Sequence, residues 1–454
     1  MRTLVPPLRW SLACAYGVLI LACFAGALRL QGTYPTADNA LFEYCGRAIV
    51  RGAALYRDVW DDKLPGVYFV NALWQLLFGS RYILHAAAET LVALLSAALL
   101  WLVMRDFEIG MRAPAAALLF AFLCLAFPLN SIEAYALPLL LAATLCARIS
   151  WILTGLFVGA AAGFWIPSLL MLVPLFALFP QRTAATMLAT AALAVAIPLG
   201  SVFWVAGPAN FTALVHTWIL YASSSTGTRV HHHLLVLNRF ARTAQALENF
   251  RDGVIASGVA AFGMLFLAIV RKPATVAQNF ALISICAMFL AAFVGSRFYS
   301  HYFISCFAAI VFGICAYLPG SRLHPARGVL LAVGIVLLAR TIQVHLSGDD
   351  SSRATIAQRL AVRAGPIVAG KLTLHVDAYR PEFYLALDPV LHDPREILGS
   401  SQDPAARSSD PADADVVIDT GQRIRSGTRV CERTAFPIEM RVKREFSRAF
   451  ASCP

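Results

Sequence analysis

Long apolar runs recur through the first 345 residues and constrain the fold of this chain more than any other feature. A helix needs about 20 mainly apolar residues to cross a bilayer, and 14% charged residues is far below the content of a soluble surface. The chain is therefore expected to be an all-α polytopic membrane protein with about 11 transmembrane helices. The candidate spans are 10–30, 82–104, 113–128, 132–147, 151–164, 166–180, 184–206, 253–270, 276–294, 302–318 and 328–345.

The loops between these runs differ in charge. If the N-terminus is cytoplasmic, the inner loops hold many basic residues and only two acidic ones, Asp106 and Glu108. This is the positive-inside pattern, and it accounts for the net charge of +11 without any nucleic-acid partner. It predicts that the outer segments are 31–81, 129–131, 207–252, 295–301 and everything after 345; in a bacterial inner (plasma) membrane this side is periplasmic.

The loop from Tyr34 to Asn71 concentrates charge immediately after the first span. Apolar residues at helical spacing predict an amphipathic helix over 38–52. A second apolar piece, 66–79, is too short to span and is expected to lie flat at the membrane interface. Residues 1–345 are thus predicted to form a transmembrane catalytic domain whose first periplasmic loop, 31–81, carries the active site.

Residues 346–454 change character, with alternating acidic and basic residues and many prolines and serines. They predict a small α/β domain on the periplasmic side, with strands over 372–377 and 415–419 and a short helix over 380–387. The chain has no phosphate-binding glycine motif in a strand–helix context and no Cys/His spacing typical of a metal site. No metal or cofactor is predicted, and a divalent metal is neither required nor excluded.

Asp38 and Lys63 each allow two interpretations. Asp38 could be a general base that accepts the proton of an attacking hydroxyl, or only a cap at the start of a helix. Lys63, with Arg57, could stabilise charge on a phosphate leaving group, or could form a salt-bridge cluster with the aspartates around it. Spacing alone favours neither interpretation.

Three blocks of sequence resemble the GT-C-fold glycosyltransferases, in the branch similar to protein O-mannosyltransferases and aminoarabinose (lipid A) transferases. The first is TADNALFEYCGRAIVRGAALYRDVWDDKLPG, with an Asp after the first span, the pattern G-x-x-x-Y-x-D, and an acidic residue, Lys and Pro. GSRFYSHYF at 295–303 and NSIEAY at 130–135 are similar to later family blocks. The resemblance covers the whole membrane part in the expected order.

The resemblance implies inverting transfer of a sugar from a polyprenyl-phosphate-linked lipid to a cell-envelope acceptor, which could be a glycolipid such as lipopolysaccharide, a polysaccharide or a protein. It implies that Asp38 is the catalytic base. The residues then expected to bind the donor phosphate or sugar are Arg57, Asp61, Asp62, Lys63, Glu133, Arg297, His301 and Tyr302. Two departures from the family pattern stand out: Leu64 separates Lys63 from Pro65, and residues 163–167, GFWIP, replace an expected Thr-Lys.

Several of these residues have plainer interpretations. Arg297 could be an interfacial arginine at a helix end, and Glu133 could be an ordinary solvated acid. His85 and Glu89, one turn apart in a span, predict a buried hydrogen-bonded pair that holds two helices together. The rival functions are a transporter or flippase, or a non-catalytic binder, of polyprenyl-linked glycans. Charge gathered at the outer boundary, with no inverted repeat, disfavours the transporter.

Overall fold

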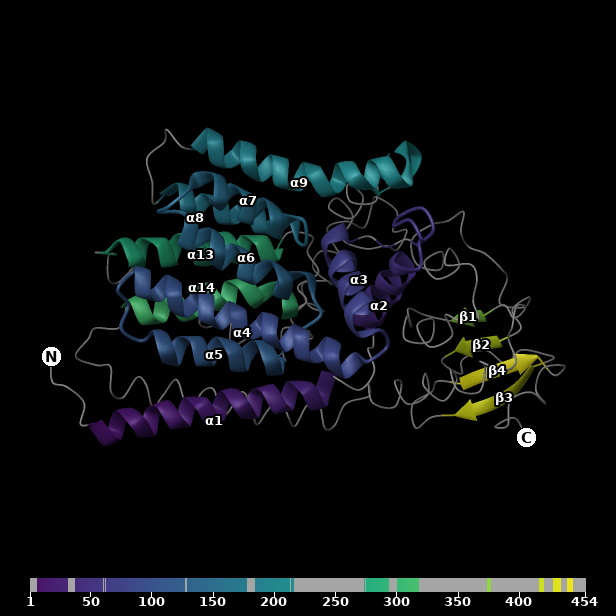
Figure 1. Ribbon diagram of the computed structural model, residues 1–454, viewed down its shortest axis with the longest axis horizontal. Helices are drawn as coiled ribbons and strands as arrows, with labels where there is room; N and C mark the ends of the chain where they lie inside the picture. Colours follow the sequence, from purple (N-terminus) through teal and green to yellow (C-terminus); the bar gives the residue numbers. More distant parts are fainter. Residues whose placement is uncertain are drawn as a thin grey trace, which may run out of the picture.

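A computed structural model describes residues 6–31, 37–59, 61, 63–126, 129–177, 184–212, 214–215, 273, 275–293, 300–317, 374–376, 416–419, 428–433 and 439–443. Apolar helices lie side by side in an elongated bundle (Figure 1). Within these ranges α4 and α9 are long and apolar enough to cross a membrane, and shorter apolar helices include Tyr16–Leu28 of α1. The bundle helices are α1 (Pro6–Gln31), α4 (Tyr82–Asp106), α5 (Arg112–Ala126), α6 (Ile132–Cys146), α7 (Trp151–Ala162), α9 (Ala184–Ala206), α13 (Val276–Phe293) and α14 (Ile304–Tyr317).

The sequence predicted these helices closely, with one difference in kind. The expected span 166–180 is a 3-10 helix, η1 (Ile166–Met171), followed by a short helix, α8 (Leu172–Ala177). Pro167 lies in the first turn of η1, and Pro174 follows in α8. Because proline has no N–H to donate, these positions interrupt a regular α-helical ladder. The candidate spans 253–270 and 328–345 lie outside the described residues, so the number of helices stays a prediction.

Two short helices, α2 (Ala37–Val50) and α3 (Pro65–Phe78), lie together at one end of the bundle (Figure 1). Gly46 permits their crossing, because a Cβ atom there would lie 2.6 Å from the backbone carbon of Asn71. The buried face of α3 includes the polar side chains Asn71 and Gln75. Its exposed face carries apolar side chains, namely Phe69, Leu73, Leu76 and Leu77. This pattern supports the prediction that α3 lies at a membrane interface.

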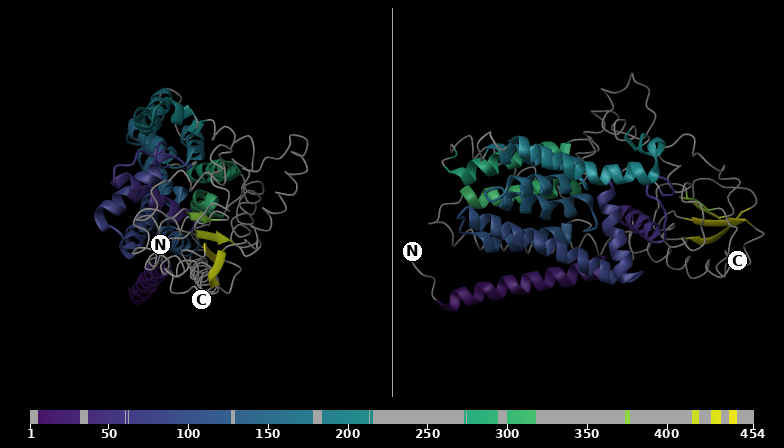
Figure 2. Two further views of the ribbon diagram at one scale, coloured as in Figure 1. Left: turned by 90° about the vertical axis from the view of Figure 1, so that its right-hand side faces the viewer. Right: turned by 45° about the horizontal axis from the view of Figure 1, so that its top comes forward.

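A small four-stranded sheet is drawn beyond α2 and α3, at the same end of the molecule (Figures 1 and 2). Its strands are β1 (Leu374–Val376), β2 (Val416–Asp419), β3 (Thr428–Arg433) and β4 (Glu439–Lys443), in the order β1-β2-β4-β3. β1 is parallel to β2, and the other pairs are antiparallel. β1 and β2 fall within the two runs predicted as strands, whereas the predicted helix 380–387 lies outside the described residues.

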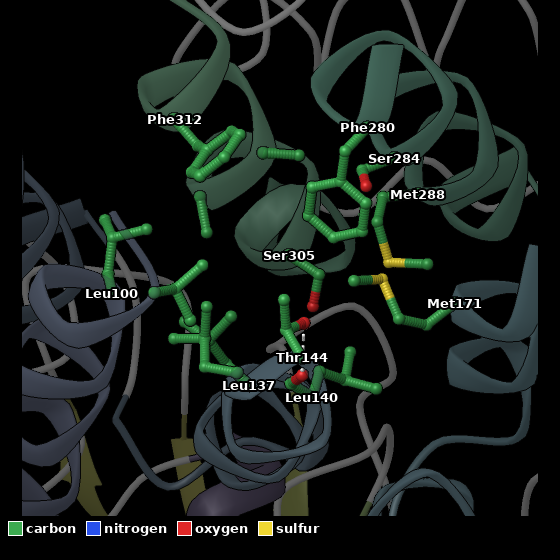
Figure 3. Close-up of a pocket in the computed structure, with 14 residues that line it drawn as sticks. Leu100, Leu137, Leu140, Thr144, Met171, Phe280, Ser284, Met288, Ser305 and Phe312 are labelled. Carbon is green, nitrogen blue, oxygen red and sulfur yellow. Dashed lines mark hydrogen bonds between the residues drawn. The ribbon is translucent and has the colours of Figure 1, made fainter. Parts of the chain in front are cut away.

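The body of the bundle is packed with apolar side chains around a small, partly open cavity. The cavity is lined by side chains of α4, α6, η1, α13 and α14. Figure 3 shows Phe280, Met288 and Phe312 turned toward it, with the hydroxyls of Thr144, Ser284 and Ser305 among them. This part of the molecule is apolar, and its few polar groups are small.

Candidate active site

Four titratable side chains lie within electrostatic range of one another's neighbours near α2 and α3, at the end of the bundle. Asp38 lies in the first turn of α2, Lys63 just before α3, Glu133 in the first turn of α6, and His301 in the 3-10 helix η4 (Ser300–Phe303). Asp38 and Lys63 each lie close enough to both Glu133 and His301 to act on them electrostatically. The fold thus brings together residues from three segments that the sequence predicted to be on one side of the membrane.

Asp38 is the second residue of α2 and is half-buried. The backbone N–H groups of a first helical turn carry a partial positive charge that favours a carboxylate there. His301 is a further neighbour, within electrostatic range of Asp38. A half-buried carboxylate at a helix start can reach both a substrate and water, as a general base must.

The backbone at Lys63 is held by a hydrogen bond from Tyr56. The hydroxyl of Tyr56 donates a hydrogen bond of 2.5 Å to the carbonyl oxygen of Lys63. Tyr56 is almost fully buried and has a φ of 63°, a left-handed conformation that is uncommon for a bulky residue. The bond uses the carbonyl of Lys63 and not its ammonium group, so this contact does not depend on the side chain that would meet a ligand.

A contact between two glycines joins this loop to the end of α7. The N–H of Gly66 donates to the carbonyl of Gly163 over 3.2 Å. A Cβ atom on Gly66 would lie 2.8 Å from that oxygen, so only glycine fits there without displacement. The neighbouring Phe164 packs against Tyr135 with ring centroids 5.7 Å apart. The segment GFWIP, which departs from the family pattern, therefore supports the loop by packing.

Asp61 is buried and accepts a hydrogen bond of 2.6 Å from the hydroxyl of Tyr68. Burial, and next the charge of Asp61, raise the pKa of Tyr68 well above its usual value, so the phenol stays a donor. Close by, Asn71 and Asn130 exchange hydrogen bonds of 2.8 and 3.0 Å. The structure therefore gives Asp61 a partner inside the protein, and its expected role in donor binding stays a prediction.

Arg57 is exposed and forms a two-pronged ion pair with the neighbouring Asp58, with both contacts at 2.9 Å. The hydrogen bond to Asp58, and then its charge, raise the pKa of Arg57. This exposed pair sets Arg57 apart from the buried part of the site, and the salt-bridge interpretation of Lys63 stays open. Asp62 and Arg297 lie outside the described residues. Tyr302 contacts His301 edge to face, with ring centroids 4.9 Å apart.

Glu133 is fully buried, and neither of its carboxyl oxygens has a hydrogen-bond partner among the residues that the structure describes. The hydroxyl of Ser131, which caps α6, accepts from the N–H of Ala134. A buried carboxyl group that lacks well-formed hydrogen bonds is costly, and the Ser131 hydroxyl, the N–H of Glu133 itself and the charge of Lys63 lie close enough to act on it. The interpretation of Glu133 as an ordinary solvated acid is therefore wrong.

A second polar cluster, which the sequence did not predict, lies beneath α2. One carboxylate oxygen of Glu43 accepts a hydrogen bond of 2.7 Å from the side-chain amide of Gln75. Its other oxygen lies 2.6 Å from Nδ1 of His85. Nε2 of His85 lies 2.8 Å from the carbonyl of Gly79. His85 is buried and hydrogen-bonded between helices, as expected, but the predicted partner Glu89 is wrong. Glu43 could have been suspected, because it is an acid on the buried, apolar side of an amphipathic helix.

Comparison with known proteins gave one kind of match. Neither a scan against models of protein families nor a search of curated proteins found a match. A search of solved structures found the crystal structure of ArnT from Cupriavidus metallidurans bound to undecaprenyl phosphate, with a TM-score of 0.60 and 14% sequence identity. The match covers 95% of this chain and 97% of that chain. The chain therefore has the fold of ArnT, which confirms, at the level of the fold, its resemblance to the aminoarabinose-transferase branch of the GT-C-fold proteins.

Proposed function

We propose that this chain is an integral membrane glycosyltransferase. It moves a sugar from a polyprenyl-phosphate-linked donor to a hydroxyl of a cell-envelope glycolipid, polysaccharide or protein, at the periplasmic face of a bacterial inner membrane. The observation that carries the proposal is the electrostatic proximity of Asp38 and Lys63 to Glu133 and His301 at one end of an apolar bundle. A carboxylate and an ammonium group at such a boundary suit a substrate with a lipid chain and a phosphate.

The proposed reaction uses Asp38 as the base. Its carboxylate accepts the proton of the acceptor hydroxyl as the acceptor oxygen forms a bond to the anomeric carbon of the donor sugar. The bond from that carbon to the phosphate oxygen breaks, and its electron pair leaves with the polyprenyl phosphate. Attack from the face opposite the leaving group inverts the configuration. Holding donor and acceptor in line supplies much of the rate enhancement.

Lys63 is the residue that we propose to hold the donor phosphate, since an ammonium group stabilises charge that develops on the leaving oxygen. The fold of ArnT, whose crystal structure contains undecaprenyl phosphate, supports a lipid of this class. Arg297, Asp62, His301 and Tyr302 complete the proposed donor site. Arg57, because it is paired with Asp58 and exposed, is proposed to lie at its edge.

The proposal is tested by Asp38→Asn, which preserves shape and removes the base. Membranes containing the variant would be incubated with polyprenyl-phosphate sugars carrying a radiolabel, and transfer to envelope acceptors measured. We expect transfer to fall by about 10²- to 10⁴-fold, which is the usual contribution of general base catalysis.

Asp106→Asn is the matched control. Asp106 is the last residue of α4, far along that helix from its start beside α3, and it forms a partly exposed ion pair with Arg148. It should transfer sugar at the wild-type rate. Wild-type transfer by Asp38→Asn would exclude Asp38 as the base. A wild-type protein that binds polyprenyl phosphate but transfers no sugar would instead indicate a non-catalytic binder.

A further inference from the structure

Glu43 sits where three helices meet, one and a half turns along α2 from Asp38. It lies on α2, while its partners Gln75 and His85 lie on α3 and α4. All three side chains are buried. The loop that carries Lys63 runs between α2 and α3, so these contacts tie down both ends of the segment that bears the proposed base and the proposed cation.

The donors and acceptors of this cluster match in only one arrangement of protons. The Gly79 carbonyl and an ionised Glu43 carboxylate are acceptors only. His85 places one ring nitrogen against each of them, at 2.8 and 2.6 Å. A proton must therefore lie between Glu43 and His85, in addition to the one that His85 donates to Gly79. Gln75 donates to the remaining oxygen of Glu43, so every member has a partner only when all three are present.

Two kinds of contact hold α2 in place, and they differ in what they can specify. One is steric, with Gly46 of α2 lying against the backbone of Asn71 in α3. A steric contact sets how closely two helices approach. Directed hydrogen bonds also fix which residues of the two helices lie opposite one another. The bonds from Glu43 to α3 and α4 are of the directed kind. Glu43 can therefore fix where along α3 and α4 the first turn of α2 comes to lie.

We propose that Glu43 is a positioning residue: through His85 and Gln75 it fixes the register of α2 and so sets Asp38 at its working distance from Lys63. This inference rests on the proposed function only for its catalytic consequence. Its structural content, the placement of α2, can be measured without any assay of activity.

The first experiment measures that placement. Spin labels are attached through non-natural residues at Val50 on α2 and Leu91 on α4, both exposed, so that the native cysteines stay in place. Electron paramagnetic resonance then reports the distance distribution between them. We expect one narrow distance in the wild type and a broadened or shifted distribution in Glu43→Ala and Glu43→Leu. An unchanged distribution in both variants would overturn the proposal.

Glu43→Gln is the conservative variant that separates positioning from mere loss of a buried charge. Its amide oxygen can accept from Gln75, and its amide nitrogen can donate to Nδ1 of a neutral His85 that still donates to Gly79. All the contacts are then satisfied without a charge. We expect Glu43→Gln to keep the narrow distance and most of the transfer activity. If it broadened the distribution as much as Glu43→Ala does, the register would depend on charge and the proposal would be wrong.

Transfer assays supply the catalytic part. A shift of about 1 Å at a reacting group can cost about 100-fold in rate, so Glu43→Ala should lower kcat by roughly 10- to 100-fold and change KM for the lipid donor by much less. Ser96→Ala, which removes a buried hydroxyl that bonds within α4, is the matched control and should change neither the distances nor the rate. If the wild type transfers no sugar while Glu43→Ala still broadens the distances, the proposed function fails and the positioning role stands.

Discussion

Most hydroxyl side chains in the body of the bundle bond within their own helix, although Gln278 of α13 donates to the carbonyl of Ala316 in α14. Beside α2 and α3, several buried polar side chains bond between elements instead. In the body, Thr144 donates to the carbonyl of Leu140 over 2.9 Å, and Ser96 bonds to Val92 in the same way. Such a bond satisfies a hydroxyl without fixing any neighbouring helix. The body is therefore held mainly by apolar packing, around the cavity of Figure 3.

At the other region the contacts join distant parts of the chain. Asn71 and Asn130 pair across 59 residues of sequence, and the indole of Trp74 donates to the hydroxyl of Tyr135 over 3.2 Å. Such bonds have strict geometry, and each leaves a buried group unsatisfied when its partner is removed. The difference teaches that directed, costly contacts gather where side chains must be placed accurately, which is the candidate active site.

Among the variants that test this comparison, the largest effect is expected from Lys63→Ala. The hydrogen bond from Tyr56 should survive the change, because it is made to the carbonyl of residue 63 and not to its side chain. Loss of the ammonium group should reduce sugar transfer by roughly 100-fold, as for other groups that stabilise a leaving oxygen.

Arg57→Ala is the control for Lys63→Ala, since Arg57 is exposed and already paired with Asp58. It should change transfer, measured with the same labelled donor, by less than about threefold, the scale of a surface ion pair. Equal losses in the two variants would show that the exposed part of the loop matters as much as its buried part.

Gly66→Ala tests the contact with the end of α7. The new methyl group would lie 2.8 Å from the Gly163 carbonyl, so the loop must move. We expect a loss of about 1–3 kcal/mol in stability, as for other overpacked sites, and a loss of transfer, measured by thermal unfolding in detergent and by the transfer assay. Gly17→Ala, which has open space around it in α1, should not destabilise the protein.

Tyr68→Phe removes one hydrogen-bond donor from buried Asp61. Loss of a hydrogen bond to a buried carboxylate should cost about 1–3 kcal/mol, which thermal unfolding in detergent would detect. A stability equal to the wild type would mean that Asp61 finds another donor or reaches water, and the contrast between the two regions would then be weaker than described.

Thr144→Val should have the smallest effect. Its hydroxyl bonds to its own helix, beside the cavity, so we expect a change of less than about 1 kcal/mol, the range of hydroxyl bonds inside membrane helices. The same unfolding measurement applies. A loss of stability as large as that of Tyr68→Phe would contradict the contrast between the two regions, because a polar contact in the body of the bundle would then stabilise the protein equally.

The helices were largely predictable because they follow from local patterns. Apolar runs of the right length correspond to α1, α4 to α7, α9, α13 and α14. The apolar residues at helical spacing in the first loop correspond to α2. The candidate site was predictable in part for a similar reason, since Asp38 and Lys63 stand in a recognisable order within one loop. The 3-10 helix Ile166–Met171, which replaces the start of an expected regular span, was missed because prolines within an apolar run do not end its hydropathy signal.

By itself, the sequence determined the class of the protein, the positions of its apolar helices and the loop that bears the candidate base, because hydrophobicity and helical period are properties of neighbouring residues. Only the tertiary structure decided that His85 pairs with Glu43 and not with Glu89, that Asp61 faces Tyr68, and that Gly66 meets Gly163. Each of these contacts depends on which helix faces land against one another. That choice is made by the packing of the whole bundle, and no short stretch of sequence contains it.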